Sequence, residues 1–376
     1  MLSSFACASE RTEVSVSGDF VYVRSDFGTN RYLIRKIDLG KKATSRNQVV
    51  NFSGARIVSS VGNVAFDRGY VVSDEKDDAT PIQFNGTHIG ANHGANFGVQ
   101  VPTNNLSGSD IGSRWVDGEG ATFTLISAIA GESATFLSNP PKDDRPWDYK
   151  ISAFSYLKPE SGGSPISTSS QRLVQIYPSV RRVSLSVDPL NLSDDGFKPV
   201  DRLDVKEVYD IFRPNSDDRA AQVEVLYSFV GISTQVYTKV TAYGDLEHFS
   251  MGGVQAGPLN HWKSSLMQKI TGSEQFASWQ DITGLGPFQR IPVAGVSEMS
   301  QKSSYGSLLY GLSVGVSKAA VDGQAVSPTQ AVMLSAAKKQ YPIGIEPYSG
   351  GFSGTMHKGD VAEVWGYRRY WAGDEE

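Results

Sequence analysis

The sequence is built from short runs in which apolar and polar residues alternate, and nearly every run ends at Gly, Asn, Asp or Pro. Successive side chains of a strand point to opposite faces, so a period of two predicts a strand with one buried face. The clearest pair lies at 20–24 and 32–37, on either side of a turn-rich segment. Further strands are expected at 48–52, 55–61, 122–129, 173–177, 183–187, 203–209, 222–229, 235–243 and 361–371.

These runs predict an all-β fold, an antiparallel β-sandwich of jelly-roll type with one or two short helices. Ser327-Pro328 is typical of a helix start, so 330–339 is expected to be helical before Pro342 ends it. Residues 259–270 are a second helix candidate.

Two polar stretches rich in Pro, Gly and Ser, 140–146 and 159–170, predict a seam in the chain. We expect an N-terminal β region at 1–150 and a C-terminal β-sandwich domain at 171–376. The same stretches equally fit long loops within one continuous sandwich.

Composition excludes several functional classes. The net charge of −5 and a pI of about 5.6 give no basic stripe for phosphates, so nucleic acid is not an expected partner. A single cysteine, Cys7, excludes a disulfide within the chain and a Cys-rich zinc site. No apolar run reaches the roughly 20 residues of a membrane span. The N-terminus is not an intact signal peptide, so we expect a secreted protein whose leader was removed, or a phage virion component.

Signatures for metals and nucleotides are absent from the sequence. It has no HExxH, EF-hand loop, Walker A motif or Rossmann glycine pattern, so no metal and no cofactor is expected. Gly-x-Ser-x-Gly does not occur as a strand-to-helix elbow either, which argues against a serine hydrolase.

The segment 85–96 concentrates polar and flexible residues, since it holds His88 and His93 among three asparagines and three glycines. Glycines let a backbone approach a ligand closely, and Asn92 beside His93 would offer an amide and a titratable imidazole. β-Elimination from a uronic acid needs a donor that neutralises the carboxylate, a base, and an acid for the leaving oxygen. A plain turn between strands is the structural alternative.

The strand at 235–243 has one polar and aromatic face, which includes Tyr237, Lys239 and Tyr243. Aromatic rings contact sugar C–H faces while polar groups bond hydroxyls, so this face is a candidate carbohydrate groove. Glu224 extends it if 222–229 pairs with this strand through a turn at Gly231.

Four further side chains complete the candidate set. His248, Gln255 and His261 lie in a loop after this strand without an evident packing role, and Arg182 could bind a carboxylate. The last strand places Glu363, Trp365, Tyr367, Arg369 and Trp371 on one face. Such a row predicts either a sugar platform or a face covered by another layer.

Residues 77–82 and 87–94 resemble a segment of poorly characterised bacterial and phage-associated β-rich proteins that carry Gly-x-Asn-His-Gly. More loosely, the chain resembles β-jelly-roll polysaccharide lyases. That resemblance implies that Asn92 neutralises the substrate carboxylate, His93 acts as the base, and Tyr237 or Tyr243 supplies the acid.

The first hypothesis is therefore a polysaccharide lyase that cleaves an acidic, uronate-containing polymer by β-elimination. Its catalytic residues would be Asn92, His93, Tyr237, Tyr243 and His248. Substrate-binding residues would be His88, Lys239, Glu224, Gln255, His261 and Arg182.

Two alternatives remain open. A glycoside hydrolase would use a pair of carboxylates, taken from Glu207, Glu224, Asp245, Glu247 and Glu346. A non-catalytic carbohydrate-binding or virion protein would use the tryptophans of the last strand. The expected partners are a polysaccharide substrate and, for a tail-like protein, further copies of the chain.

Overall fold

The computed structural model follows the alternation of the sequence. It describes residues 11–40, 52–61, 65–73, 82–84, 87–89, 96–103, 105–118, 120–139, 156–176, 179–189, 196–213, 217–247, 249–254, 267–282, 289–293, 298–327, 331–334, 340–346, 351–373. The strands among these form four antiparallel sheets, and two short 3-10 turns, η1 (Phe66–Arg68) and η2 (Gly108–Asp110), are the helical elements described.

The largest sheet, called the long sheet below, includes the strands with the clearest sequence signal. Its order is β15 (Ser179–Asp188), β17 (Leu203–Phe212), β18 (Arg219–Val230), β19 (Ser233–Ala242), β29 (Val361–Ala372), β25 (Leu308–Val321), β24 (Glu298–Tyr305), β21 (Met267–Ile270) and β22 (Gln280–Asp281), with β26 (Gln324–Val326) paired to β25.

Two smaller sheets pack against the long sheet. The N-terminal sheet has the order β16 (Lys198–Val200), β1 (Thr12–Ser17), β2 (Phe20–Asp26), β3 (Arg31–Asp38), β4 (Phe52–Ser59) and β5 (Tyr70–Ser73). The short-strand sheet has the order β23 (Gln289–Pro292), β27 (Ala331–Leu334), β28 (Gln340–Ile345), β20 (Ser250–Gly252), β6 (Ile82–Phe84) and β7 (Thr87–Ile89).

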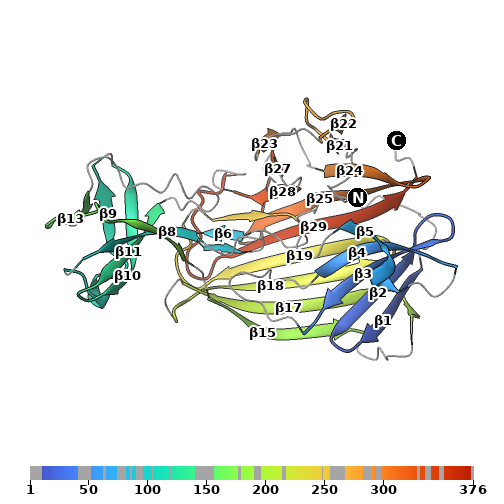
Figure 1. The fold of residues 1–376 in the computed structure, drawn as a ribbon, viewed down its shortest axis with the longest axis horizontal. Coiled ribbons are helices and arrows are strands. Elements are labelled where there is room, and N and C mark those ends of the chain that lie inside the picture. Colours follow the sequence, from blue (N-terminus) through green and yellow to red (C-terminus); the bar gives the residue numbers. More distant parts are fainter. Residues whose placement is uncertain are drawn as a thin grey trace.

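A fourth sheet has a core of its own. Its order is β13 (Ile166–Ser167), β12 (Tyr156–Pro159), β9 (Arg114–Asp117), β10 (Thr122–Ile129), β11 (Ser133–Asn139), β8 (Asn96–Pro102) and β14 (Arg172–Ile176). Trp115 packs edge-on against Phe136 in this separate cluster. Figure 1 shows this sheet at one end of the molecule, away from the N-terminal sheet.

The main core lies between the long sheet and the two sheets that face it. Val14 and Leu33 of the N-terminal sheet join Val223 and Val236 of the long sheet in one buried cluster. The N-terminal sheet crosses the long sheet in Figure 1. Residues of the expected region 1–150 and of the expected domain 171–376 thus contribute to a common core.

A buried arginine ties these two layers together. The guanidinium of Arg35, which has no exposed surface, donates to the carbonyl oxygens of Ser233 and Gly231 and to Oγ1 of Thr234. Gly231, at φ 51°, turns the chain between β18 and β19, a conformation that favours glycine. Its amide donates to Oγ1 of Thr12 at 2.6 Å. The N-terminal sheet thus holds the turn of the hairpin.

The predicted all-β antiparallel sandwich is confirmed, but the helices are not. Residues 331–334, inside the expected helix 330–339, form β27, which pairs with both β23 and β28. Residues 267–270, the end of the second expected helix, form β21. The strand neighbours satisfy the backbone groups of both segments, and this tertiary pairing overrides the local helix signal. The remaining residues of both predictions lie outside the described ranges.

Candidate functional site

In β17, β18, β19 and β29 the long sheet has one buried and one half-exposed face, as the alternation of β18 and β19 predicts. Val236, Val240 and Ala242 point into the core, whereas Tyr237 and Lys239 lie on the other face, called the outer face below. The two strands form the expected hairpin, in which Glu224 lies opposite Lys239. β29 then pairs with β19 and adds its own outward row to the same face.

The centre of the outer face is an aromatic pair, Tyr237 and Trp365. They lie directly opposite each other on β19 and β29, with ring centroids 5.1 Å apart and tilted by 41°. The Tyr237 hydroxyl donates to Glu363, and the Nζ atom of Lys318 lies 4.4 Å from the Trp365 centroid. Burial and the Glu363 hydrogen bond raise the pKa of Tyr237, so its hydroxyl stays protonated at neutral pH.

A charged triad adjoins this pair. Glu224 lies 2.5 Å from Nζ of Lys206 and 3.0 Å from Nζ of Lys239. The hydrogen bond from Lys206 is the main reason that the pKa of Glu224 is lowered, and Lys239 acts in the same sense while partial burial opposes both. A carboxylate held ionised in this way can accept hydrogen bonds from hydroxyls, but it is a poor proton donor at neutral pH.

Glycines on β25 let two further aromatic rings lie flat on the outer face. Gly315 is opposite Tyr367, and a Cβ atom added there would lie 2.4 Å from that ring. Gly311 is opposite Trp371 and is covered by its indole in the same way. Trp371 is 5% exposed and packs on Trp279, so this end of the row is covered, whereas Trp365 and Tyr367 stay partly exposed.

A second polar group lies on the buried side of the long sheet. Glu207 of β17 is 2% exposed, and its Oε1 lies 3.4 Å from Nη1 of Arg182 on β15. Burial raises the pKa of Glu207 to about 7, although Tyr209 and Arg182 act against the shift. Arg182 also donates to the carbonyl oxygen of Leu39 at 2.9 Å. The arginine predicted to bind substrate therefore pairs with a carboxylate of the protein itself.

Two carboxylates that the hydrolase hypothesis would pair lie on opposite faces. Glu207 is on the buried face of β17, and Glu224 is on the outer face of β18. One β-sheet separates them, so they cannot flank one glycosidic bond. Asp245 is 66% exposed at its side chain and lies 3.2 Å from Nδ1 of His357. Glu247 is exposed and Glu346 is half-buried.

Tyr243 lies apart from Tyr237 at the far end of β19. The guanidinium of Arg219 stacks over its ring, with Cζ 3.7 Å from the centroid, and Arg219 also pairs with Asp210 at 3.2 Å. Tyr243 lies six positions beyond Tyr237 along the extended chain, roughly 20 Å, so the two tyrosines do not act on the same atom of a ligand.

Several predicted site residues lie outside the part of the chain that the structure describes. Asn92, His93, His248, Gln255 and His261 are not among the described residues. The backbone of His88, in β7, pairs with Gln83 of β6.

Two polar side chains of the core were missed by the sequence reading. Tyr227, on the buried face of β18, is 3% exposed, and its hydroxyl has no hydrogen-bond partner among the described residues. Arg368, on the buried face of β29, is 2% exposed. In the sequence, both residues could be noticed as polar groups on an otherwise apolar strand face. Tyr227 shares its face with Phe229, and Arg368 shares its face with Tyr370.

Neither a membrane span nor a metal cluster is found in the described residues. No helix there is long and apolar enough to cross a bilayer. No group of three or more His, Cys, Asp or Glu side chains lies close enough to hold a metal ion, within the same ranges.

Comparison with known proteins gives similarity to solved structures alone. No protein-family model and no curated protein matches the chain. A galactose mutarotase-like protein from Clostridium acetobutylicum is 9% identical, with a TM-score of 0.35 over 98% of this chain and 100% of its own. An aldose 1-epimerase candidate from Escherichia coli K12 is 12% identical, with a TM-score of 0.32 over 96% and 98%.

The prediction of a polysaccharide lyase is wrong on this comparison, because the similar structures carry the names of a mutarotase and an epimerase. With TM-scores below 0.5, however, the likeness carries no argument for any activity of this chain.

Proposed function

We propose that the protein binds a carbohydrate on the outer face of the long sheet, with Tyr237 and Trp365 as the stacking platform. The observation that carries this proposal is their cross-strand pairing, with centroids 5.1 Å apart, on a face where both rings stay partly exposed. Paired rings of this kind offer an apolar surface for sugar C–H groups.

The charges around the rings support a polar, hydroxyl-rich ligand. The side chains of Glu224 and Lys239 are 23% and 32% exposed, so each keeps some access to solvent while the pair holds its position. Glu363, opposite Lys239, adds a second carboxylate beside the rings. Ionised carboxylates accept strong hydrogen bonds from hydroxyls, and ammonium groups donate them. Such bonds would fix the orientation of a stacked sugar.

The proposal is for binding without cleavage. Glu224 is held ionised by two lysines, and Tyr237 is held protonated. These states suit fixed hydrogen bonds and do not suit a group that must exchange a proton at neutral pH. A binding role also suits the prediction that the protein is secreted or is part of a phage particle.

The test is retention on a panel of acidic and neutral polysaccharides, read together with reducing ends in the same mixture. We expect saturable binding to at least one polymer and no new reducing ends after prolonged incubation. Absence of binding to every polymer would contradict the proposal, and fragments of a bound polymer would replace it with an enzyme.

A further inference from the structure

The strand β15 forms one edge of the long sheet. It is paired with β17 on one side, and no backbone hydrogen bond joins its other side to a further segment of the described chain. Figure 1 shows β15 along the lower margin of the sheet. In an edge strand, alternate residues direct their N–H and C=O groups away from the neighbouring strand, and these groups can pair with one more strand.

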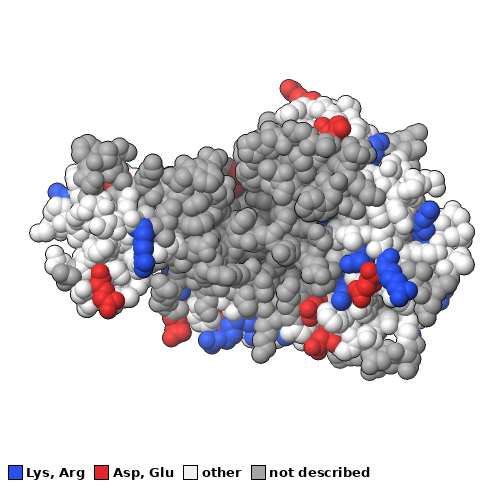
Figure 2. All heavy atoms as spheres, in the orientation of Figure 1, with Lys and Arg blue, Asp and Glu red and all other residues white. Residues whose placement is uncertain are grey.

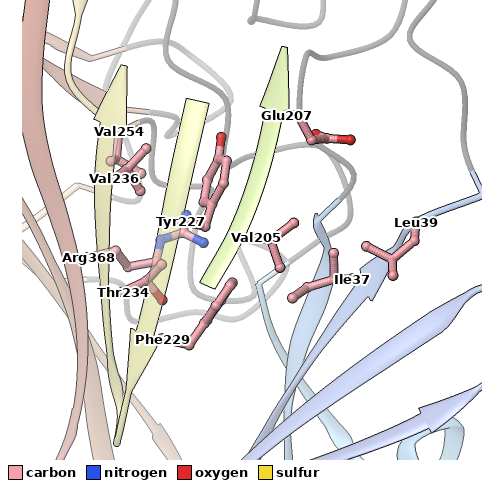
Figure 3. A pocket seen from close by; sticks show the side chains of 10 residues that line it. All are labelled: Ile37, Leu39, Val205, Glu207, Tyr227, Phe229, Thr234, Val236, Val254 and Arg368. Atoms are coloured by element: carbon pink, nitrogen blue, oxygen red, sulfur yellow. The ribbon is translucent and has the colours of Figure 1, made fainter. Parts of the chain in front are cut away.

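The inner face of β15 is less covered than that of its neighbour. Leu185 and Val187 pack against the main core but stay half-buried. Glu207 and Val205, which lie opposite them on β17, are buried and line the interior between the two sheets (Figure 3). A further strand beside β15 would cover the two apolar side chains that are now half-buried.

Two charged side chains on the outer face of β15 lack an ion pair. Arg181 and Asp188 are exposed, and neither lies within salt-bridge distance of an opposite charge in the described part of the chain. Arg181 lies over the Phe212 ring instead, with Cζ 5.0 Å from the centroid. The residues opposite them on β17, Asp210 and Asp204, have arginine partners of their own. Figure 2 shows basic and acidic side chains near one another along this lower margin of the molecule.

A β-bulge makes these two charges symmetric about Leu185. The ladder between β15 and β17 skips Val183, which is 54% exposed. Leu185 lies opposite position 207 of β17, whereas Arg181 and Asp188 lie opposite positions 210 and 204, so each charge is three ladder steps from Leu185. A bulge is also a device that protects a sheet edge from pairing, and by that role alone the chain would be a monomer.

We propose that β15 pairs with β15 of a second copy of the chain, antiparallel and two-fold symmetric about Leu185. The symmetry places Arg181 of each copy opposite Asp188 of the other, so one dimer gains two cross-strand ion pairs. The two Leu185 side chains meet on the inner face and cover each other. β15 is three strands away from β19 in the sheet order, so this pairing does not depend on the proposed carbohydrate platform.

Sedimentation velocity of the full chain tests this pairing. We expect the wild type to sediment as a dimer at micromolar concentrations and to dissociate as salt is added, because exposed ion pairs are screened. Arg181→Asp and Asp188→Arg each turn both ion pairs into repulsions, so each variant alone should dimerise at least tenfold more weakly. An equimolar mixture of the two variants restores opposite charges in both pairs, and it should dimerise as the wild type does.

Arg114→Asp is the matched control, because it makes the same change of charge at an exposed side chain of the fourth sheet, which has a core of its own. It should leave dimerisation unchanged, and urea unfolding followed by circular dichroism establishes that each variant is folded. A wild type that stays monomeric up to about 100 µM overturns the proposal, since that range reveals any dimer with a micromolar Kd. The proposal is equally overturned if dimers form and neither reversal weakens them, or if the mixture stays as weak as its components.

Discussion

Replacement of Glu207 by Gln should remove the pH dependence that this buried carboxyl imposes on stability. Its pKa is about 7 in the folded protein, against 4.5 for a free side chain, because burial disfavours the charged form. Between these values the folded state holds the proton more tightly than the unfolded state. The contribution of this group is therefore fully favourable below about pH 4.5 and is lost as the pH rises through about 7.

The size of the effect follows from the shift. One pKa unit corresponds to 1.36 kcal/mol, so the shift of Glu207 costs about 3 kcal/mol once the carboxyl is ionised in both states. Glutamine keeps the shape and cannot ionise. The stability of Glu207→Gln relative to the wild type should therefore rise by about 2–3 kcal/mol between pH 5 and pH 8.

The assay is urea unfolding at several pH values for the wild type and two variants. Glu224→Gln is the matched control, because Lys206 and Lys239 lower the pKa of that carboxyl. The stability that the Glu224 carboxylate contributes is present above the unfolded pKa of 4.5 and is lost as the pH falls through the folded pKa. The difference in free energy of unfolding between Glu224→Gln and the wild type should therefore stay constant between pH 6 and pH 8. A flat difference for Glu207→Gln over the same range would refute the reasoning.

Three further substitutions test the packing. Arg35→Met removes the donor to the Gly231 carbonyl and should lower the free energy of unfolding by about 3 kcal/mol in urea titration. An unchanged urea midpoint would show that the packing of the two layers does not depend on Arg35. Gly315→Ala should displace the Tyr367 ring and lower that free energy by about 1–3 kcal/mol, and a stabilised variant would contradict the flat stacking. Tyr227→Phe should stabilise the protein by about 1 kcal/mol, and a loss of similar size would mean that the hydroxyl is satisfied.

The strands were predictable because their signal is local. The expected strand 122–129 is β10 to the residue, and 235–243 and 361–371 differ from β19 and β29 by one or two residues at their ends. The alternation also predicted which side chains of β19 face outward, since a period of two fixes both faces at once. The expected helix at 330–339 failed because its signal was local as well, while the strand neighbours of β27 come from distant parts of the chain.

The site was predictable only in part. The polar, aromatic face that carries Tyr237, Lys239 and Glu224 followed from alternation, and the hairpin through Gly231 placed the three together. The partners of Arg182 could not be predicted, because its contacts with Glu207 and Leu39 depend on how a second strand and a second sheet lie over β15. The sequence marks Tyr227 only by a hydroxyl on an otherwise apolar strand face, and this does not predict that the hydroxyl lacks a partner.

The central claim is that Trp365 forms part of a carbohydrate platform. Its most direct test is the dissociation constant of the best-bound glycan, measured by calorimetry for the wild type, Trp365→Ala and Tyr305→Ala. Tyr305 is the control, since it is 39% exposed and stacks on Tyr70 instead of the platform. We predict at least tenfold weaker binding for folded Trp365→Ala, about 1.4 kcal/mol, and wild-type affinity for Tyr305→Ala. Equal affinity of Trp365→Ala and the wild type would contradict the account.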